Sequence, residues 1–186
     1  GDFLYIREVC FMKTKEIVLS GMFLALGLLL PFLTMQIPQI GSMLLPMHIP
    51  VLLCGLICGP ALGAIVGVIT PILRNMLFGM PPMPGAIFMA AELLTYGLVI
   101  GLVYTKAKKK NTTAVYTSML VAMLVGRVVW GIVKFLFVSS KGGAFTLPMF
   151  FAEAFTGAIP GIILQLVLIP AVMISLDKAG YIHFDK

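Results

Sequence analysis

Five ionisable side chains interrupt the apolar stretches of this sequence, and their chemistry suits the binding of a polar solute. They are Arg74, Glu92, Arg127, Lys134 and Glu153. An ionisable side chain inside a bilayer costs at least about 2.5 kcal/mol on insertion scales, so such groups usually face an interior or a cavity and mark function. The cations outnumber the carboxylates by one, and an anionic group such as a carboxylate on the solute would balance them. The alternative is that single members face lipid headgroups or pair elsewhere, and Lys134 in particular can extend to the interface.

Two aromatic side chains accompany these charges at helical spacing. Tyr96 follows Glu92 by four residues, and Trp130 follows Arg127 by three, so each ring shares a helical face with its charge. Trp130 is the only tryptophan and lies too deep for a typical interfacial belt. Each ring either lines a pocket or takes part in ordinary helix packing.

Two further polar residues are candidates for the same site. His48 stands between Pro46 and Pro50 and is either a structural cap or a binding residue. Asn75 follows Arg74 and hydrogen-bonds either a ligand or the backbone.

The elements that position these residues are membrane-spanning helices. The 186 residues are 60% hydrophobic and 11% charged, with a mean hydropathy of +1.09, which is far beyond the apolar share of a soluble domain. Apolar stretches of roughly 20 residues recur, each long enough to cross a hydrocarbon core about 30 Å thick as a helix. Runs such as 24–30 lack the alternating polarity of barrel strands. We therefore predict an all-α integral membrane protein of the cell membrane, without a separate soluble domain.

Six transmembrane helices are predicted along the chain. They cover residues 15–35, 48–58, 61–78, 85–105, 113–138 and 147–176. The break at Cys58-Gly-Pro-Ala61 is expected because proline removes a donor and disfavours helix in the residue before it. Residues 1–11 precede Met12 and are interpreted as an upstream extension or a recombinant remnant. Residues 12–180 form one six-helix membrane domain, and 181–186 form a cytoplasmic tail.

Basic residues flank the predicted spans at one end. They are Lys13, Lys15, Lys106, Lys108, Lys109, Lys110 and Lys178. Because cytoplasmic loops retain positive charge, both termini are predicted to be cytoplasmic. This topology accounts for the net charge of +6 without a nucleic-acid partner.

The depth of the ionisable residues is asymmetric. Counting about 1.5 Å per residue from the outer loop ends puts all five in the outer half or at the midplane. The inner third offers only Gln165 and some hydroxyls. A channel needs polar groups along its whole path, so this pattern indicates a cup that is open to the outside and binds without free passage.

Motifs for catalysis and for nucleotide binding are absent from the sequence. It contains no GxxxxGK[ST] loop, no GxSxG serine site, no HExxH zinc site and no dense carboxylate cluster. We therefore expect no catalytic residue, no metal and no cofactor. Cys54 and Cys58 lie four apart on one helical face and, with Cys10, make an odd count, so they are interpreted as packing residues rather than as a disulfide.

Small residues form two strips at a spacing of four. The first strip consists of Gly55, Gly59, Gly63 and Gly67, and the second of Gly21 and Ala25 in the first span. Such spacing lets another backbone approach closely. The neighbour is either another span of this chain or another protein.

These features resemble the substrate-binding S components of energy-coupling factor (ECF) vitamin transporters. The likeness is carried by the short six-span layout, by the strip GMFLA at 21–25, and above all by LPMHIPVLLCGLICGPALGAIVG at 45–67 leading into PILR at 71–74. It extends from Met12 to about Ala179. The resemblance implies a subunit that captures a small water-soluble vitamin from outside and joins one transmembrane coupling protein and two ATPase subunits.

The resemblance also implies which residues bind and which dock. In the family the site is built by the loop after span 1 with spans 4, 5 and 6, and a small-residue strip on span 1 meets the coupling protein. The pocket candidates carried over are Glu92, Tyr96, Arg127, Trp130, Lys134 and Glu153. Gly21 and Ala25 would form the docking strip, although the family usually has alanine where Gly21 stands. The His-Ile-Pro and Leu-Arg-Asn patterns are most similar to the pantothenate-type branch.

Alternatives to this interpretation concern the substrate and the mode of transport. The vitamin could be pyridoxine, hydroxymethylpyrimidine, riboflavin or folate instead of pantothenate. A stand-alone secondary carrier would work without ATPase partners and might carry inverted repeats, of which no convincing example is present. A purely structural membrane subunit would bind no ligand, which the buried charges argue against.

Overall fold

Proline, glycine and long apolar runs divide the chain into helices. The computed structural model describes residues 2–34 and 44–185, with side chains from Thr14 onward except that of Thr34. The elements are α1 (Asp2–Leu29), the 3-10 helix η1 (Leu30–Thr34), α3 (His48–Cys58), α4 (Pro60–Phe78), α5 (Gly85–Lys106), α6 (Thr112–Ser140), α7 (Leu147–Ala154), the 3-10 helix η2 (Thr156–Ala158) and α8 (Ile159–Lys178). This part of the chain contains no strand, and the prediction of an all-α membrane protein is confirmed.

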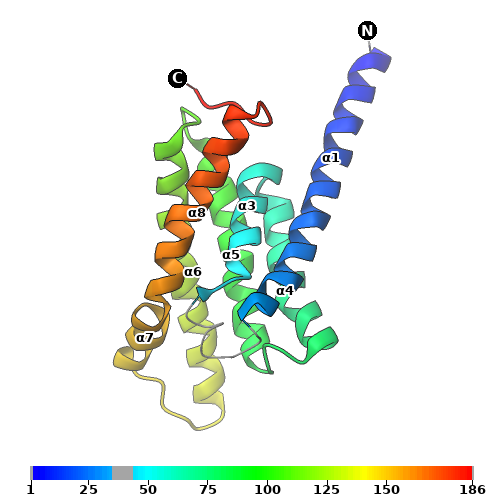
Figure 1. Ribbon diagram of the computed structural model, residues 1–186. Helices are drawn as coiled ribbons and strands as arrows, with labels where there is room; N and C mark the ends of the chain where they lie inside the picture. The colour runs from blue at the N-terminus through cyan, green and yellow to red at the C-terminus, as the bar shows by residue number, and fades with distance from the viewer. Residues whose placement is uncertain (1, 35–43, 186) are drawn as a thin grey trace.

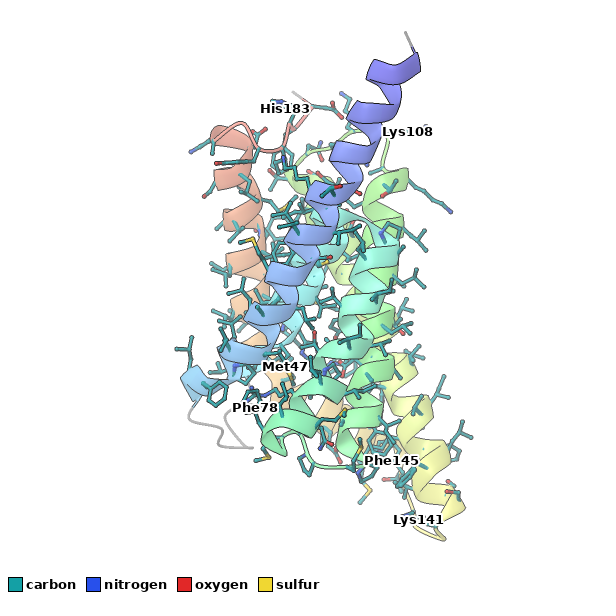
Figure 2. All side chains as sticks on the ribbon, turned by 90° about the vertical axis from the view of Figure 1, so that its right-hand side faces the viewer. Met47, Phe78, Lys108, Lys141, Phe145 and His183 are labelled. Carbon is teal, nitrogen blue, oxygen red and sulfur yellow. The ribbon has the colours of Figure 1, made fainter. Side chains whose placement is uncertain are left out.

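The helices form a bundle with alternating direction. In Figure 1 the start of α1 and the end of α8 lie at the same end of the bundle. Figure 2 shows Lys108 and His183 at that end, and Lys141 and Phe145 at the opposite end. An even number of crossings, such as the six predicted, brings both termini to the same end of the bundle, as observed here. We refer to the end with the termini as the inner end, because its assignment to the cytoplasm is the prediction made from the lysines.

One of the six crossings is short. Five segments are long and apolar enough to span a membrane, whereas α3 has 11 residues, which is about 16 Å at 1.5 Å per residue. α3 therefore covers about half of the hydrocarbon core, and its first residue, His48, lies well inside the bundle. The predicted break after α3 is present, with Gly59 at φ 91° between α3 and Pro60.

Two predicted spans are present, but each contains a change in helix type that the sequence analysis did not predict. The span predicted at 147–176 is not one helix, since α7 ends at Ala154 and a 3-10 turn precedes α8. Pro160 has no N–H to bond back into the preceding turn, which favours this interruption. In the span predicted at 15–35 the α-helix ends at Leu29 and continues as 3-10 helix around Pro31, for the same reason. α1 already begins at Asp2, so it includes most of residues 1–11. The interpretation of these residues as an extension or a recombinant remnant stays a prediction.

Glycines bring α3, α4 and α5 into backbone contact. A Cβ at Gly55 would lie 2.6 Å from the carbonyl oxygen of Gly97, and one at Gly63 would lie 2.7 Å from the Cα of Gly55. A Cβ at Gly67 would overlap the backbone of Leu93. The strip predicted at 55–67 is thus used for packing within the chain, apart from Gly59, which meets nothing within 4 Å.

An apolar core fills the inner half of the bundle. It combines residues of α3, α5, α6 and α8, including Leu52, Ile100, Met119, Met123, Ile169 and Met173. The buried hydroxyls nearby are satisfied by their own helices: Thr70 donates to Val66, Thr95 to Ala91 and Ser118 to Ala114. Buried Cys54 and Cys58 are free thiols. This half of the bundle therefore offers little to a polar solute.

Candidate functional site

A cluster of buried charged and polar side chains lies at the outer edge of the apolar core. Glu92 of α5, Arg127 of α6 and His48 of α3 are 2%, 4% and 0% exposed. The Glu92 Oε1 atom lies 3.0 Å from Nη1 of Arg127 and 3.3 Å from Nε2 of His48. Three helices that are distant in sequence thus each place one polar group at the same point.

Tyr96 completes the wall of this cluster. Its ring lies 5.1 Å from the imidazole of His48, at an interplanar angle of 68°, and the residue is 1% exposed. The ring occupies the space next to Gly126, where any Cβ would overlap it. Gly126 therefore lets α6 approach α5 closely enough for Arg127, the next residue, to reach Glu92.

Several polar atoms of the cluster are buried without a hydrogen-bond partner among the described residues. They are Nδ1 and Nε2 of His48, Oε1 of Glu92, and Nε and Nη2 of Arg127. Arg127 and Glu92 bring opposite charges together and His48 lies beside them, but the angles do not complete hydrogen bonds. An unsatisfied buried polar group costs about 1–3 kcal/mol, and more when it is charged. The cluster is therefore costly to the fold by itself and is chemically suited to hold a polar solute.

Arg74 and Asn75 are not part of this cluster. The Arg74 guanidinium donates to the carbonyl oxygen of Leu28 in α1 and lies 4.8 Å and 5.3 Å from the ring centroids of Phe32 and Phe78. The Asn75 amide donates to the carbonyl oxygen of Pro81 at 2.6 Å. Both side chains thus tie α4 to its neighbours at the outer end.

Lys134, Glu153 and Trp130 form a third group between α6 and α7. Lys134 pairs with Glu153, and its ammonium lies 4.9 Å from the ring of Trp130 and 5.1 Å from that of Phe145. The Glu153 side chain is 49% exposed. This ion pair is more accessible than the one between Glu92 and Arg127.

The separation into three groups corrects the charge argument made from the sequence. Glu92 balances Arg127, Glu153 balances Lys134, and the excess cation is Arg74, which lies with α1. The five ionisable residues are not one set, because positions of equal depth point to different sides of their helices. The sum of these charges therefore does not indicate an anion site, whereas the unpaired atoms of the cluster do.

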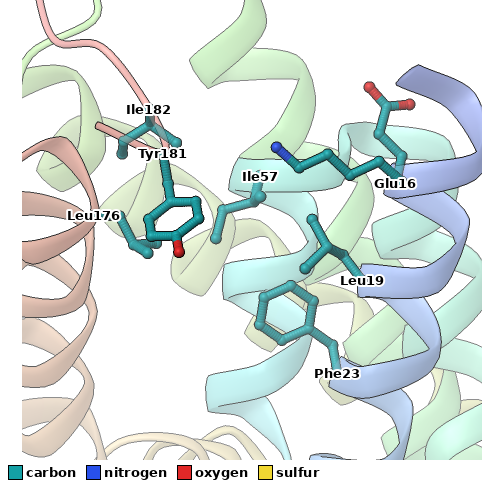
Figure 3. A pocket seen from close by; sticks show the side chains of 8 residues that line it. Glu16, Leu19, Phe23, Ile57, Leu176, Tyr181 and Ile182 are labelled. Carbon is teal, nitrogen blue, oxygen red and sulfur yellow. The ribbon is translucent and has the colours of Figure 1, made fainter. Parts of the chain in front are cut away.

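Two of the cavities in the described chain have walls from more than one element, and both lie outside the cluster. One of about 310 Å³ lies between α6 and the segment 145–150 and has mostly apolar walls. The other, of about 400 Å³, lies near the inner end between α1, the end of α3 and the residues around the end of α8, as Figure 3 shows. It is lined mainly by apolar side chains such as Phe23 and Ile57, with Glu16 at its edge. Lys15 also lines it. Neither cavity contains a residue of the buried cluster.

The small-residue strip of α1 has no neighbour in the described chain. Gly21 and Ala25 are exposed, and a Cβ at Gly21 would meet nothing within 4 Å. By contrast, a Cβ at Gly27 would lie 2.7 Å from Thr70 of α4. α1 thus packs on the bundle through one face and leaves the face with Gly21 and Ala25 open.

One buried polar residue was placed wrongly by the sequence analysis. Gln165 of α8 is 1% exposed, and its Nε2 atom has no hydrogen-bond partner among the described residues. A continuous helix from residue 147 would put it in the inner third of the membrane. Because the helix is interrupted before Ile159, Gln165 lies only six residues into α8. The turn signal TGAIP at 156–160 could have indicated this.

The comparisons with known proteins agree with this architecture. No curated protein and no solved structure matches the chain. A family model described as "ECF transporter, substrate-specific component" matches residues 15–176. This range begins in the part of α1 that is predicted to cross the membrane and ends in the last turn of α8. The chain is a multi-pass membrane protein with a transport role rather than an enzyme. It belongs to the family of substrate-specific components of ECF transporters.

Proposed function

We propose that the cluster of His48, Glu92, Tyr96 and Arg127 binds a small water-soluble vitamin or vitamin precursor taken up from outside the cell, with pantothenate as the favoured substrate. The observation that carries the proposal is the set of unpaired charged and polar atoms in a site that is almost fully buried. Partners from a bound solute would offset the cost of burying them. The preference for pantothenate comes from the resemblance of the His-Ile-Pro pattern at 48–50 and the Leu-Arg-Asn pattern at 73–75 to that branch.

The position of the cluster supports binding from the outer side. Glu92 lies seven residues from the outer end of α5, about 10 Å along the helix axis. Towards the inner end the apolar core follows directly. A solute in the cluster would thus face an apolar barrier on the inner side, and release to the cytoplasm would need a change in the whole protein. This is the behaviour expected of a subunit that depends on an energy source elsewhere.

We propose that the energy source is a module of one transmembrane coupling protein and two ATPases, docked on the strip of Gly21 and Ala25. The strip is exposed and free of side-chain bulk, so another helix can approach its backbone closely. Loading with vitamin would precede docking, and ATP hydrolysis in the partners would reorient this subunit. Lys134, Glu153 and Trp130 lie nearer the outer end and would contact the solute as it enters.

The proposal is tested by binding to the purified full chain. Thermal unfolding would be measured with pantothenate, pyridoxine, hydroxymethylpyrimidine, riboflavin and folate, each over a range of concentrations. A ligand at 100 times its Kd stabilises by about 2.7 kcal/mol, which raises the unfolding midpoint of a chain of this size by roughly 5–11 °C. We expect one vitamin to do so, and pantothenate first. The absence of a shift with every vitamin would contradict the proposal.

A matched pair of arginine variants tests the position of the site. Arg127 and Arg74 are both buried cations of transmembrane helices, but only Arg127 lies in the cluster. Arg127→Met should weaken binding of the vitamin by well over tenfold, because it removes charged hydrogen bonds and leaves Glu92 without its cation. Arg74→Met should lower thermal stability and leave the Kd close to that of the wild type. Loss of binding in Arg74→Met alone would place the site elsewhere.

A further inference from the structure

The guanidinium of Arg127 has one edge in use and one edge free. Nη1 faces Glu92 at 3.0 Å, whereas Nε and Nη2 are buried without a hydrogen-bond partner among the described residues. The N–H bonds of Nε and Nη2 point in the same direction in the guanidinium plane and match the two oxygens of a carboxylate. Since Arg127 is only 4% exposed, this free edge is a buried bidentate donor.

Gln165 lies on the face of α8 that packs into the bundle. The buried residues Gly161, Gln165, Ile169 and Met173 recur every four positions, and α8 packs against α3 and α6. Ile169 and Met173 belong to the apolar core. Gln165 lies one turn further out than Ile169, and Arg127 lies one turn further out than the core residue Met123 of α6.

The depth of Gln165 matches that of the cluster. Counted from the inner ends of their helices, Gln165 is 13 residues from Lys178, Glu92 is 14 from Lys106, and Arg127 is 15 from Thr112. These separations correspond to about 20, 21 and 22 Å. By residue count, Gln165, Glu92 and Arg127 thus lie at about the same depth, in a layer at the outer edge of the apolar core that we call the polar layer.

Gln165 differs from the other buried neutral polar residues in its hydrogen bonding. The hydroxyls of Thr70, Thr95 and Ser118 each donate to a carbonyl of their own helix. The amide Nε2 of Gln165 has no partner in the described chain. A buried amide donor without a partner lowers stability, so its presence in the polar layer points to a ligand.

We propose that Arg127 holds a carboxylate of the solute through Nε and Nη2, and that Gln165 donates a second hydrogen bond to the same solute. This inference rests on the proposed function and specifies its substrate class. The solute is therefore a small carboxylic acid.

The charge of the layer changes when such an acid is bound. Arg127 and Glu92 already compensate each other, so a carboxylate adds one negative charge to a buried site. His48 lies beside this pair, with Nε2 3.3 Å from Oε1 of Glu92. The other polar side chain against the imidazole is Tyr96, whose ring packs at 5.1 Å.

Pairs of acids and uncharged counterparts test the carboxylate. Isothermal titration calorimetry on the full chain in lipid nanodiscs would compare pantothenate with panthenol, nicotinate with nicotinamide, and biotin with biotin amide. We expect the acid that binds to do so at least tenfold more tightly than its counterpart. Equal affinity within a pair, or binding only of a neutral or cationic vitamin, overturns the inference and leaves the proposed function intact. Absence of binding by every acid and every vitamin tested overturns both.

A glutamine variant separates binding from folding. Gln165→Leu should weaken binding of the acid by about tenfold, since one hydrogen bond to a charged group is lost. The same variant should leave the unfolding midpoint of the solute-free protein unchanged or higher, because it removes an unpaired buried amide. Ser118→Ala is the matched control, a buried polar residue bonded within α6, and should keep the wild-type affinity.

Two results would contradict the role of Gln165. Wild-type affinity in Gln165→Leu would show that its amide does not contact the solute. A lower midpoint in the solute-free protein together with weaker binding would show that the residue supports the fold instead. Either result overturns the assignment of Gln165, while the acid and neutral pairs still decide the carboxylate.

Discussion

The ion pair of Glu92 and Arg127 provides the most direct test of the buried cluster as a physical unit. Both residues are nearly inaccessible, and their charged atoms lie 3.0 Å apart. Removal of one partner leaves the other as an uncompensated buried charge, which costs about 3–5 kcal/mol. With a change of 2–4 °C per kcal/mol for a chain of this size, Glu92→Gln or Arg127→Met should lower the unfolding midpoint of the solute-free protein by roughly 6–20 °C.

The double variant should be less unstable than the sum of the two single variants. Glu92→Gln with Arg127→Met removes both charges, so neither remains buried without its counterion. We expect an interaction free energy of at least about 2 kcal/mol in the double-mutant cycle. His48 also lies 3.3 Å from Glu92 and supports the carboxylate in Arg127→Met, so the loss in that variant should fall at the lower end of the range.

The pair of Lys134 and Glu153 is the control for this cycle. It is an ion pair between α6 and α7 with a carboxylate side chain that is 49% exposed. Accessible ion pairs contribute about 0–1 kcal/mol, so Lys134→Met and Glu153→Gln should change the midpoint by only a few degrees. Thermal unfolding of all five variants in the same detergent would be compared. Additive losses in the cycle of Glu92 and Arg127 would refute the reasoning that the two residues form one buried unit.

The remaining predictions concern the glycines that pack and the glycine that is open. Gly67→Ala should lower the unfolding midpoint by several degrees, because the new Cβ would overlap the backbone of Leu93 and force α4 away from α5. The cost of this displacement is about 1–3 kcal/mol. Gly21→Ala should leave the midpoint unchanged, because a Cβ at Gly21 would meet no atom of the described chain within 4 Å. Gly21→Leu should abolish vitamin uptake in cells that supply the ATPase module, while the purified variant binds vitamin with wild-type affinity; normal uptake would show that the strip is not a docking surface.

The sequence by itself determined the class of the protein and the segments of the chain that can cross a membrane. Composition and the length of the apolar runs are enough to predict transmembrane helices, because a bilayer requires about 20 apolar residues per crossing. The break at 58–61 could be predicted because the backbone chemistry of glycine and proline is local. The same holds for the expectation that Glu92 and Arg127 lie near mid-depth, since depth follows from a residue count.

The interrupted last span shows where counting along the chain fails. The assumption of one continuous helix from 147 to 176 placed Gln165 too far towards the inner end. In the structure α8 extends only from Ile159 to Lys178. Hydropathy does not register a helix interruption in which every residue is apolar or small. Hydropathy alone therefore misplaces Gln165, whose depth follows from the 3-10 turn at Thr156–Ala158.

Only the tertiary structure decided which charged residues meet. Arg74, Glu92 and Arg127 are all buried residues of transmembrane helices, yet Arg74 faces α1 and the other two face each other. The reason is that depth is set by the number of residues along a helix, whereas the direction of a side chain around the bundle depends on how helices pack. Here that packing follows from backbone contacts at glycines such as Gly63 and Gly97, which fix the rotation of α4 and α5. The sequence identified the residues that are costly in lipid, and the helix packing determined that His48, Glu92 and Arg127 share one site.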